Sequence, residues 1–166
     1  TLGNFLIKRV VFEIQEELPN IKHFGTLSPI PGFRDWFSYL EDVKIKNILG
    51  EASIDNISFL KSSDLKVGDP RIVSNKEAIT KLVAHYLMNE KNHKQLPIND
   101  VCRFHLGNGA IIDDIIINAN VSEVGLNRSF GVMVNYLYEL KNIEKNHEEY
   151  INNKTIIISD KLKKII

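Results

Sequence analysis

The ten residues from Gly131 to Leu140 most narrow what this chain can fold into, because the segment is apolar on both faces of an extended strand. A strand of that kind is typical of the centre of a sheet, where both faces are covered. Two other segments favour strands: Ile21 to Leu27, which we expect to lead Ser28 into a loop, and the isoleucine-rich run Ala110 to Asn118. We therefore expect a domain organised around a sheet.

Helical patterns occupy much of the remaining sequence. Apolar residues recur at helical spacing from Leu2 to Leu18, before Pro19, and again from Phe33 to Leu40. Ser74 followed by Glu77 has the pattern of a capping box in front of a third helix. The apolar face of that third helix consists of Ile79, Leu82, Val83, Tyr86 and Leu87.

The second half of the chain predicts shorter helices. One begins at Asn99 or Asp100 and ends at Gly107-Asn108-Gly109, where left-handed backbone costs little. Another runs from a cap at Ser122 to Phe130, and the tail is expected to be helical and solvated. The signal is weakest between Glu41 and Arg71. Alternating strands and helices favour an α/β or α+β fold with a mixed sheet.

Length and composition limit the classes of function. A chain of 166 residues suits one domain, and a single Cys102 cannot form an internal disulfide, which fits a reducing compartment. Lys plus Arg equals Asp plus Glu at 21 each, so no global field attracts nucleic acid or an anionic membrane. No apolar run approaches the roughly 20 residues of a spanning helix. We expect neither nucleic acid nor a membrane as partner.

His105 is the first candidate for chemistry, because it lies beside the flexible turn Gly107-Asn108-Gly109. An ordinary histidine pKa near 6.5 lets the side chain give and regain a proton at neutral pH. On spacing alone, a role in core packing or in capping the turn is the stronger interpretation of a single histidine.

Ser28 is the second candidate. It ends an apolar run and is followed by Pro29, Pro31 and Gly32, which fix the exit of the chain. Taken alone, a serine before proline is usually a loop or cap residue. No Gly-x-Ser-x-Gly elbow is present, so a hydrolytic triad fits poorly. His85 and His93 do not form a His-Glu-x-x-His pattern, and we predict no metal site.

Four blocks in order resemble the malonyl-CoA decarboxylase family: Gly3 to Val11, Leu27 to Phe33, Arg103 to Ala110, and Ser122 to Leu126 continued by Val134 to Tyr138. They cover nearly the whole chain. The resemblance implies a mixed-sheet acetyltransferase (GNAT) fold, of which residues 1–166 form the later, C-terminal part of one catalytic domain. It also implies a helical domain and the first half of the catalytic domain ahead of this segment.

The same resemblance implies conversion of malonyl-CoA to acetyl-CoA and carbon dioxide. His105 would protonate the thioester enolate, and Ser28 would position the carboxylate or orient His105. Thr1, Leu2, Gly3 and Asn4 would end the turn that binds the coenzyme A pyrophosphate, at a helix start with free amides. Tyr138 would lie near the active site. No separate cofactor is implied, because the thioester itself accepts the electrons and coenzyme A is part of the substrate.

Two other functions remain open at this point. An N-acyltransferase of the same fold would need an acceptor amine, whereas a non-catalytic acyl-CoA-binding domain would bind without turnover. Release of carbon dioxide without an acceptor distinguishes them. We further expect a homo-oligomer formed through parts outside this chain, an isolated chain without activity, and a cytoplasmic location, or a mitochondrial or peroxisomal one in a eukaryote.

Overall fold

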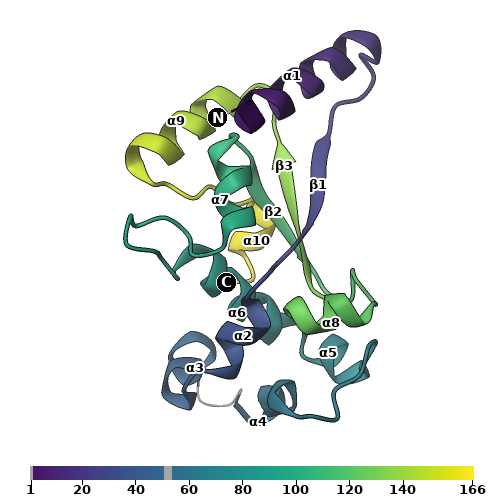
Figure 1. The fold of residues 1–166 in the computed structure, drawn as a ribbon, viewed down its shortest axis with the longest axis vertical. Helices are drawn as coiled ribbons and strands as arrows, with labels where there is room; N and C mark the ends of the chain where they lie inside the picture. The colour runs from purple at the N-terminus through teal and green to yellow at the C-terminus, as the bar shows by residue number, and fades with distance from the viewer. Residues whose placement is uncertain (1, 51–53) are drawn as a thin grey trace.

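A computed structural model describes residues 2–50 and 54–166. Figure 1 shows a small sheet crossed at one end by α1, with short helices gathered at its other end. The elements follow in the order α1 (Leu2–Glu17), β1 (Phe24–Pro29), α2 (Phe33–Ser38), α3 (Asp42–Leu49), α4 (Ile54–Ile57), the 3₁₀ helix η2 (Ser58–Lys61), α5 (Pro70–Ser74), α6 (Lys76–Met88), α7 (Asp100–Gly107), β2 (Ile111–Ile116), α8 (Glu123–Ser129), β3 (Met133–Tyr138), α9 (Ile143–Asn153) and α10 (Asp160–Lys163).

The sheet has the strand order β1-β3-β2, so the strand predicted to be central is central. Both pairings are antiparallel, and the expected mixed sheet is wrong for these strands. Parallel pairing among the described residues is confined to a bridge between Ile112 and Ile158. The sequence pattern identified the strands but not their directions, because direction depends on where the long helical connections return the chain.

The first strand lies further along the chain than the sequence predicts. Ser28 was expected in a loop, but it lies within β1, opposite Val134 of β3. Pro29 ends the strand without disrupting the sheet, since proline is tolerated at the end of an edge strand. Ser28 is consequently held by the sheet, with only 6% of its surface exposed.

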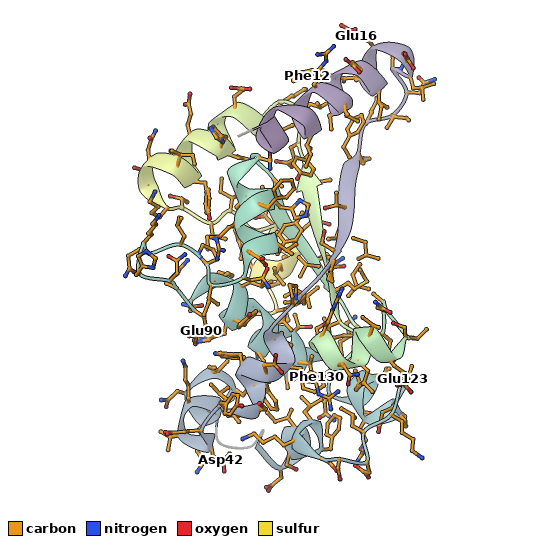
Figure 2. The ribbon with its side chains drawn as sticks, in the orientation of Figure 1. Phe12, Glu16, Asp42, Glu90, Glu123 and Phe130 are labelled. Carbon is orange, nitrogen blue, oxygen red and sulfur yellow. The ribbon has the colours of Figure 1, made fainter. Side chains whose placement is uncertain are left out.

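One hydrophobic core joins the sheet to the helices. Every member of the predicted apolar face of α6 is buried. An aromatic cluster fastens α2 to the end of α8: the Phe130 ring meets Phe33 and Phe37 edge-on, with centroid distances of 5.9 and 5.8 Å. Figure 2 places Phe130 at the junction between the sheet and the lower helices. This cluster fixes the chain as it leaves β1.

The caps of α7 and α8 agree with the sequence, whereas the cap of α6 does not. The Asn99 side chain accepts a hydrogen bond from the Cys102 amide at 2.8 Å, and Ser122 caps α8 in the same way. The predicted capping box is wrong, because Ser74 is the last residue of α5 and its hydroxyl donates to the Pro70 carbonyl. Asp69 caps α5, and the chain enters α6 through Asn75 instead.

The remaining sequence is more structured than its pattern indicates. The weakly patterned region contains α3, α4, η2 and the start of α5, and it buries Ile45 and Ile57. The tail helix α9 was expected to be solvated, but it buries Ile143, Asn146 and Tyr150 and contacts α7. None of the helices within the described ranges is long and apolar enough to cross a membrane.

Candidate active site

His105 lies in the last turn of α7, with 6% of its surface exposed and both ring nitrogens within hydrogen-bonding distance of a hydroxyl. Its Nε2 is 3.0 Å from the Ser28 Oγ, and its Nδ1 is 2.7 Å from the Tyr138 hydroxyl. Ser28 is 77 positions away in the sequence and Tyr138 is 33 positions away. The fold thus brings together three predicted site residues: Ser28 of β1, Tyr138 of β3 and His105 of α7.

Strand alternation explains why these side chains meet. Ser28 faces Val134 across the β1–β3 pairing, and Thr26 faces Tyr136. Because every second residue of a strand points to the same side, these four residues and Tyr138 share one face of the sheet. Helix α7 covers that face with its own buried side, which carries His105.

The end of α7 is fixed by close backbone contacts. Gly109 has a φ of +82°, and a Cβ atom there would lie 2.2 Å from the Ile143 carbonyl oxygen. Only glycine combines that left-handed conformation with such a close approach to another backbone. The Ala110 amide also donates to the His105 carbonyl at 3.1 Å. The turn that marked His105 in the sequence is therefore what anchors its helix against α9.

The hydroxyl groups around His105 allow a continuous line of hydrogen bonds. The Ser28 Oγ is 3.3 Å from the Thr26 Oγ1. If Tyr138 donates to Nδ1, the proton of the neutral ring lies on Nε2 and is donated to the Ser28 Oγ. The Ser28 hydrogen is then free to be donated to Thr26 or to a bound ligand. In the opposite tautomer the ring proton lies on Nδ1, and the Ser28 hydroxyl would donate its hydrogen to Nε2.

Burial lowers the pKa of His105 below the ordinary value that the sequence predicts. Desolvation lowers the pKa of His105 to about 4, so its imidazole is neutral at pH 7 in the unliganded protein. The expectation of an ordinary pKa near 6.5 is therefore corrected. Burial also raises the pKa of Tyr138, which keeps the phenol protonated as a hydrogen-bond donor.

A cavity of about 420 Å³ adjoins this cluster. Thr26 and Tyr138 line it from the sheet, and the apolar face of α1 closes the opposite side. The other lining residues are Ile7, Val10, Val11, Ile14, His23, Phe24 and Gly25. The polar cluster therefore borders a mainly apolar chamber at the edge of the sheet.

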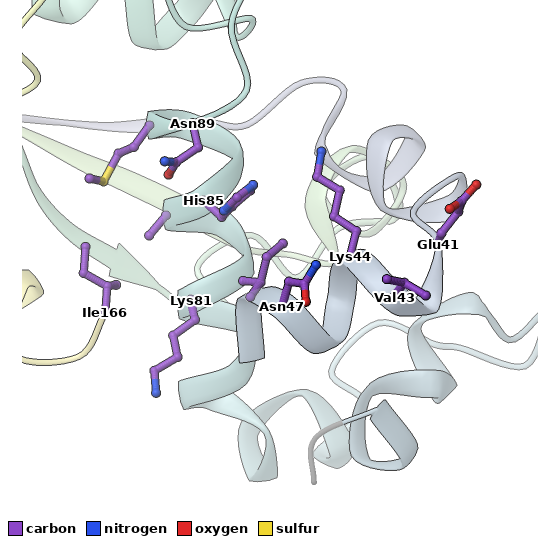
Figure 3. Close-up of a pocket in the computed structure, with 11 residues that line it drawn as sticks. Glu41, Val43, Lys44, Asn47, Lys81, His85, Asn89 and Ile166 are labelled. Carbon is purple, nitrogen blue, oxygen red and sulfur yellow. The ribbon is translucent and has the colours of Figure 1, made fainter. Parts of the chain in front are cut away.

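A larger cavity, of about 740 Å³, lies elsewhere, between α3 and α6. Figure 3 shows His85, Lys44 and Lys81 among its lining residues. Burial lowers the pKa of His85, whose Nε2 is 3.4 Å from a Glu90 carboxylate oxygen. Within residues 2–50 and 54–166 no three His, Cys, Asp or Glu side chains are grouped to hold a metal ion. Of the predicted site residues, the described side chains of Ser28, His105 and Tyr138 do not border this cavity.

The predicted coenzyme A contacts, Thr1 to Asn4, lie at the N-terminal end of the chain. Thr1 lies outside the described residues, as do the side chains of Leu2, Gly3 and Asn4. The backbone of Leu2, Gly3 and Asn4 forms the first turn of α1, in agreement with the helix start expected there. The role of these four residues stays a prediction.

Comparison with known proteins shows which family the chain belongs to. A family model described as "Malonyl-CoA decarboxylase C-terminal domain" matches residues 1–166. The chain belongs to this family. The mitochondrial malonyl-CoA decarboxylase of Rattus norvegicus is 34% identical over 183 residues, and that of Anser anser anser is 34% identical over 179 residues. The family resemblance noted in the sequence is confirmed.

Solved structures give the same result for the fold. The crystal structure of malonyl-CoA decarboxylase from Rhodopseudomonas palustris matches 99% of the chain with a TM-score of 0.88 and 36% identity. That from Cupriavidus metallidurans matches 100% of it with a TM-score of 0.84 and 34% identity. The chain spans 37% of the rat malonyl-CoA decarboxylase and 38% of the R. palustris chain.

Two residues of the cluster were missed in the sequence. Thr26 precedes Ser28 by two positions, and Tyr136 precedes Tyr138 by two, so each shares a face with a predicted site residue. The Tyr136 ring stacks on His105, with centroids 4.3 Å apart and planes at 16°. Period-two spacing would have indicated both residues once the strands and their buried face were known.

Proposed function

We propose that the complete protein converts malonyl-CoA to acetyl-CoA and carbon dioxide. The observation that carries this proposal is the buried line from Tyr138 through His105 to Ser28, in a chain of the malonyl-CoA decarboxylase C-terminal domain family. The relatives bear that activity in their names. No cofactor is proposed beyond the coenzyme A of the substrate.

The reaction makes two demands on the protein. The bond between the carboxylate carbon and the α-carbon breaks, carbon dioxide leaves, and the electron pair moves into the thioester as an enolate. A proton must then reach the α-carbon, while the carboxylate is held out of the plane of the thioester carbonyl. A hydrogen-bond donor for the carboxylate and a proton donor beside it are therefore needed.

Ser28 meets the first demand if its hydroxyl hydrogen is free. With the imidazole proton on Nε2 and donated to the Ser28 Oγ, the hydroxyl can turn from Thr26 to a carboxylate oxygen. A buried hydroxyl positions that carboxylate more effectively than an exposed one, because surrounding water is excluded. We assign Ser28 to carboxylate positioning on this basis.

His105 meets the second demand from its neutral state. The α-carbon of a thioester enolate is a stronger base than the imidazolate that would be left, so a neutral Nε2–H can supply the proton. The Tyr138 hydroxyl, donating to Nδ1, stabilises the negative charge that develops on the ring. Solvent then returns a proton to Nε2. The balance is one carbon–carbon bond broken, one carbon–hydrogen bond formed and one solvent proton consumed.

Other features of the complete protein are also proposed. The whole catalytic domain has an acetyltransferase-like (GNAT) fold, and sequence beyond these 166 residues supplies its other parts. Those other parts also hold the protein together as a homo-oligomer. The protein acts in the cytoplasm, or in mitochondria or peroxisomes if eukaryotic; the rat and goose relatives are named as mitochondrial. Size measurements and cell fractionation test these points.

The coenzyme A phosphates are proposed to bind at Thr1 to Asn4, where helix α1 begins with free amides. A bulky side chain at Gly3 would obstruct the approach of a phosphate to the backbone. Gly3→Val in the complete protein should therefore weaken acetyl-CoA binding, measured by calorimetry, with the melting temperature of the variant measured alongside. Unchanged affinity in Gly3→Val would rule out this placement.

The reaction itself is tested by incubating the complete protein with malonyl-CoA in the absence of any amine. Stoichiometric carbon dioxide and acetyl-CoA are expected. Transfer of an acyl group to an added amine without carbon dioxide would favour an N-acyltransferase. Tight acetyl-CoA binding without either product would indicate a non-catalytic binding domain.

A further inference from the structure

Tyr136 contacts His105 in a way that neither Ser28 nor Tyr138 does. Its ring lies nearly parallel to the imidazole, with centroids 4.3 Å apart, and only 1% of the residue is exposed. The hydrogen bonds to Ser28 and Tyr138 act within the imidazole plane, at opposite ends of the ring. They leave the ring free to tilt about the line between its two nitrogens, and a flat surface against one face removes that freedom.

We propose that Tyr136 is a positioning residue whose ring holds the imidazole of His105 in the plane from which Nε2 reaches Ser28. This inference rests on the decarboxylation proposed above. Tyr136 does not touch the reacting atoms and acts through His105. Because a displacement of about 1 Å can lower a rate about a hundredfold, control of the tilt of a proton donor has a direct effect on turnover.

Contacts on several sides fix the position of Tyr136, and a residue that orients another side chain needs such restraint. Tyr136 lies in the central strand, opposite Thr26 on one side and Ile112 on the other. Its hydroxyl interacts with the Cys102 side chain, and the Cys102 thiol donates to the Leu87 carbonyl oxygen at 3.9 Å.

Two tyrosines of β3, Tyr136 and Tyr138, face two residues of α7, Cys102 and His105. Cys102 and His105 are three residues apart on the helix and so lie on the same side of it. Tyr136 and Tyr138 are two residues apart on the strand and share its buried face. Tyr136 meets both members of the helix pair, by its hydroxyl and by its ring, whereas Tyr138 meets His105 alone.

Two substitutions in the complete protein separate the ring from the hydroxyl. Tyr136→Phe keeps the stacked ring, and its kcat for malonyl-CoA should stay within about threefold of the wild type. Tyr136→Leu keeps an apolar side chain but removes the flat surface, and its kcat should fall at least about tenfold with KM nearly unchanged. An equal loss in both variants would overturn the assignment to the ring.

Tyr86→Leu is the matched control, because Tyr86 is also a buried tyrosine, 4% exposed, and its ring packs at a tilt against the rings of Phe33 and Trp36. Tyr86→Leu should lower the melting temperature, but the kcat of each folded molecule should not show the decrease expected for Tyr136→Leu. If Tyr136→Leu and Tyr86→Leu lose activity only in proportion to the unfolded fraction, Tyr136 has a packing role and the proposal fails.

Ring-nitrogen NMR of labelled histidine gives a readout independent of turnover. Loss of the stacked ring admits water to one face of His105, so its titration in Tyr136→Leu should move from the wild-type position toward that of an ordinary histidine, whereas Tyr136→Phe should titrate like the wild type. An unchanged titration in Tyr136→Leu would overturn the proposal. If the wild type releases no carbon dioxide, the proposed function fails, and this titration still decides whether Tyr136 orients His105.

Discussion

At the scale of single residues, the state of His105 depends on long-range packing that its neighbours in sequence do not reveal. The turn beside it identified His105 as a candidate, and the sequence predicted a partner in Ser28. The lowered pKa arises because residues far along the chain cover the imidazole. Thr26 and Tyr136 were missed for the same reason, since only the strand pairing places them around the ring.

The pH dependence of turnover follows from this buried state. Burial lowers the pKa of His105 to about 4, so the neutral form is already present at every pH above about 5 in the free enzyme. If neutral His105 supplies the proton, kcat/KM should show no step from His105 between pH 6 and 8 and should fall only as the pH approaches 4. Initial rates with the complete protein measure this. A tenfold decrease per pH unit above 6.5 would instead indicate an imidazolium donor.

At the scale of elements, locally determined features were predictable and tertiary ones were not. The cap at Asn99 and the cap at Ser122 depend on residues within one turn of each helix, and both were predicted. The capping box at Ser74 failed because Asp69 and Pro70 start an earlier helix. Strand direction and the place of Ser28 inside β1 depend on pairing with β3, which no local pattern specifies.

The turn after α7 provides a test at this scale. Gly109→Ala combines an unfavourable positive φ with a Cβ only 2.2 Å from the Ile143 carbonyl oxygen, so it must displace α7 or α9. Gly68→Ala is the control, since Gly68 has a φ of +74° but nothing within 4 Å of a Cβ. We expect Gly109→Ala to cost at least about 2 kcal/mol more stability than Gly68→Ala. Equal melting temperatures for the two variants would contradict the close packing of this turn.

At the scale of the whole molecule, the sheet has an open edge and the site borders a chamber. Among the described residues, no strand pairs with the outer edge of β1. Helix α1 lines the chamber beside Tyr138 opposite the sheet. The relatives are longer than this chain, which spans 37% of the rat malonyl-CoA decarboxylase. In the function proposed above, we expect sequence beyond these 166 residues to complete the site.

The purified 166-residue chain should therefore show no turnover of malonyl-CoA, because an unpaired strand edge and a partial thioester site leave the reacting groups without their full surroundings. The complete protein, assayed in parallel at the same molar concentration, is the control. Carbon dioxide release by the chain alone, at a rate near that of the complete protein, would show that the site is already whole.

The most direct test of the proposed chemistry compares Ser28→Ala, His105→Ala and the double variant of the complete protein. Each single variant should release carbon dioxide at least about a hundredfold more slowly while acetyl-CoA affinity and melting temperature stay near the wild-type values. The double variant should be little slower than the poorer single one, because Ser28 and His105 are joined by one hydrogen bond and act as a unit. Near-normal carbon dioxide release by folded His105→Ala would contradict the proposed mechanism.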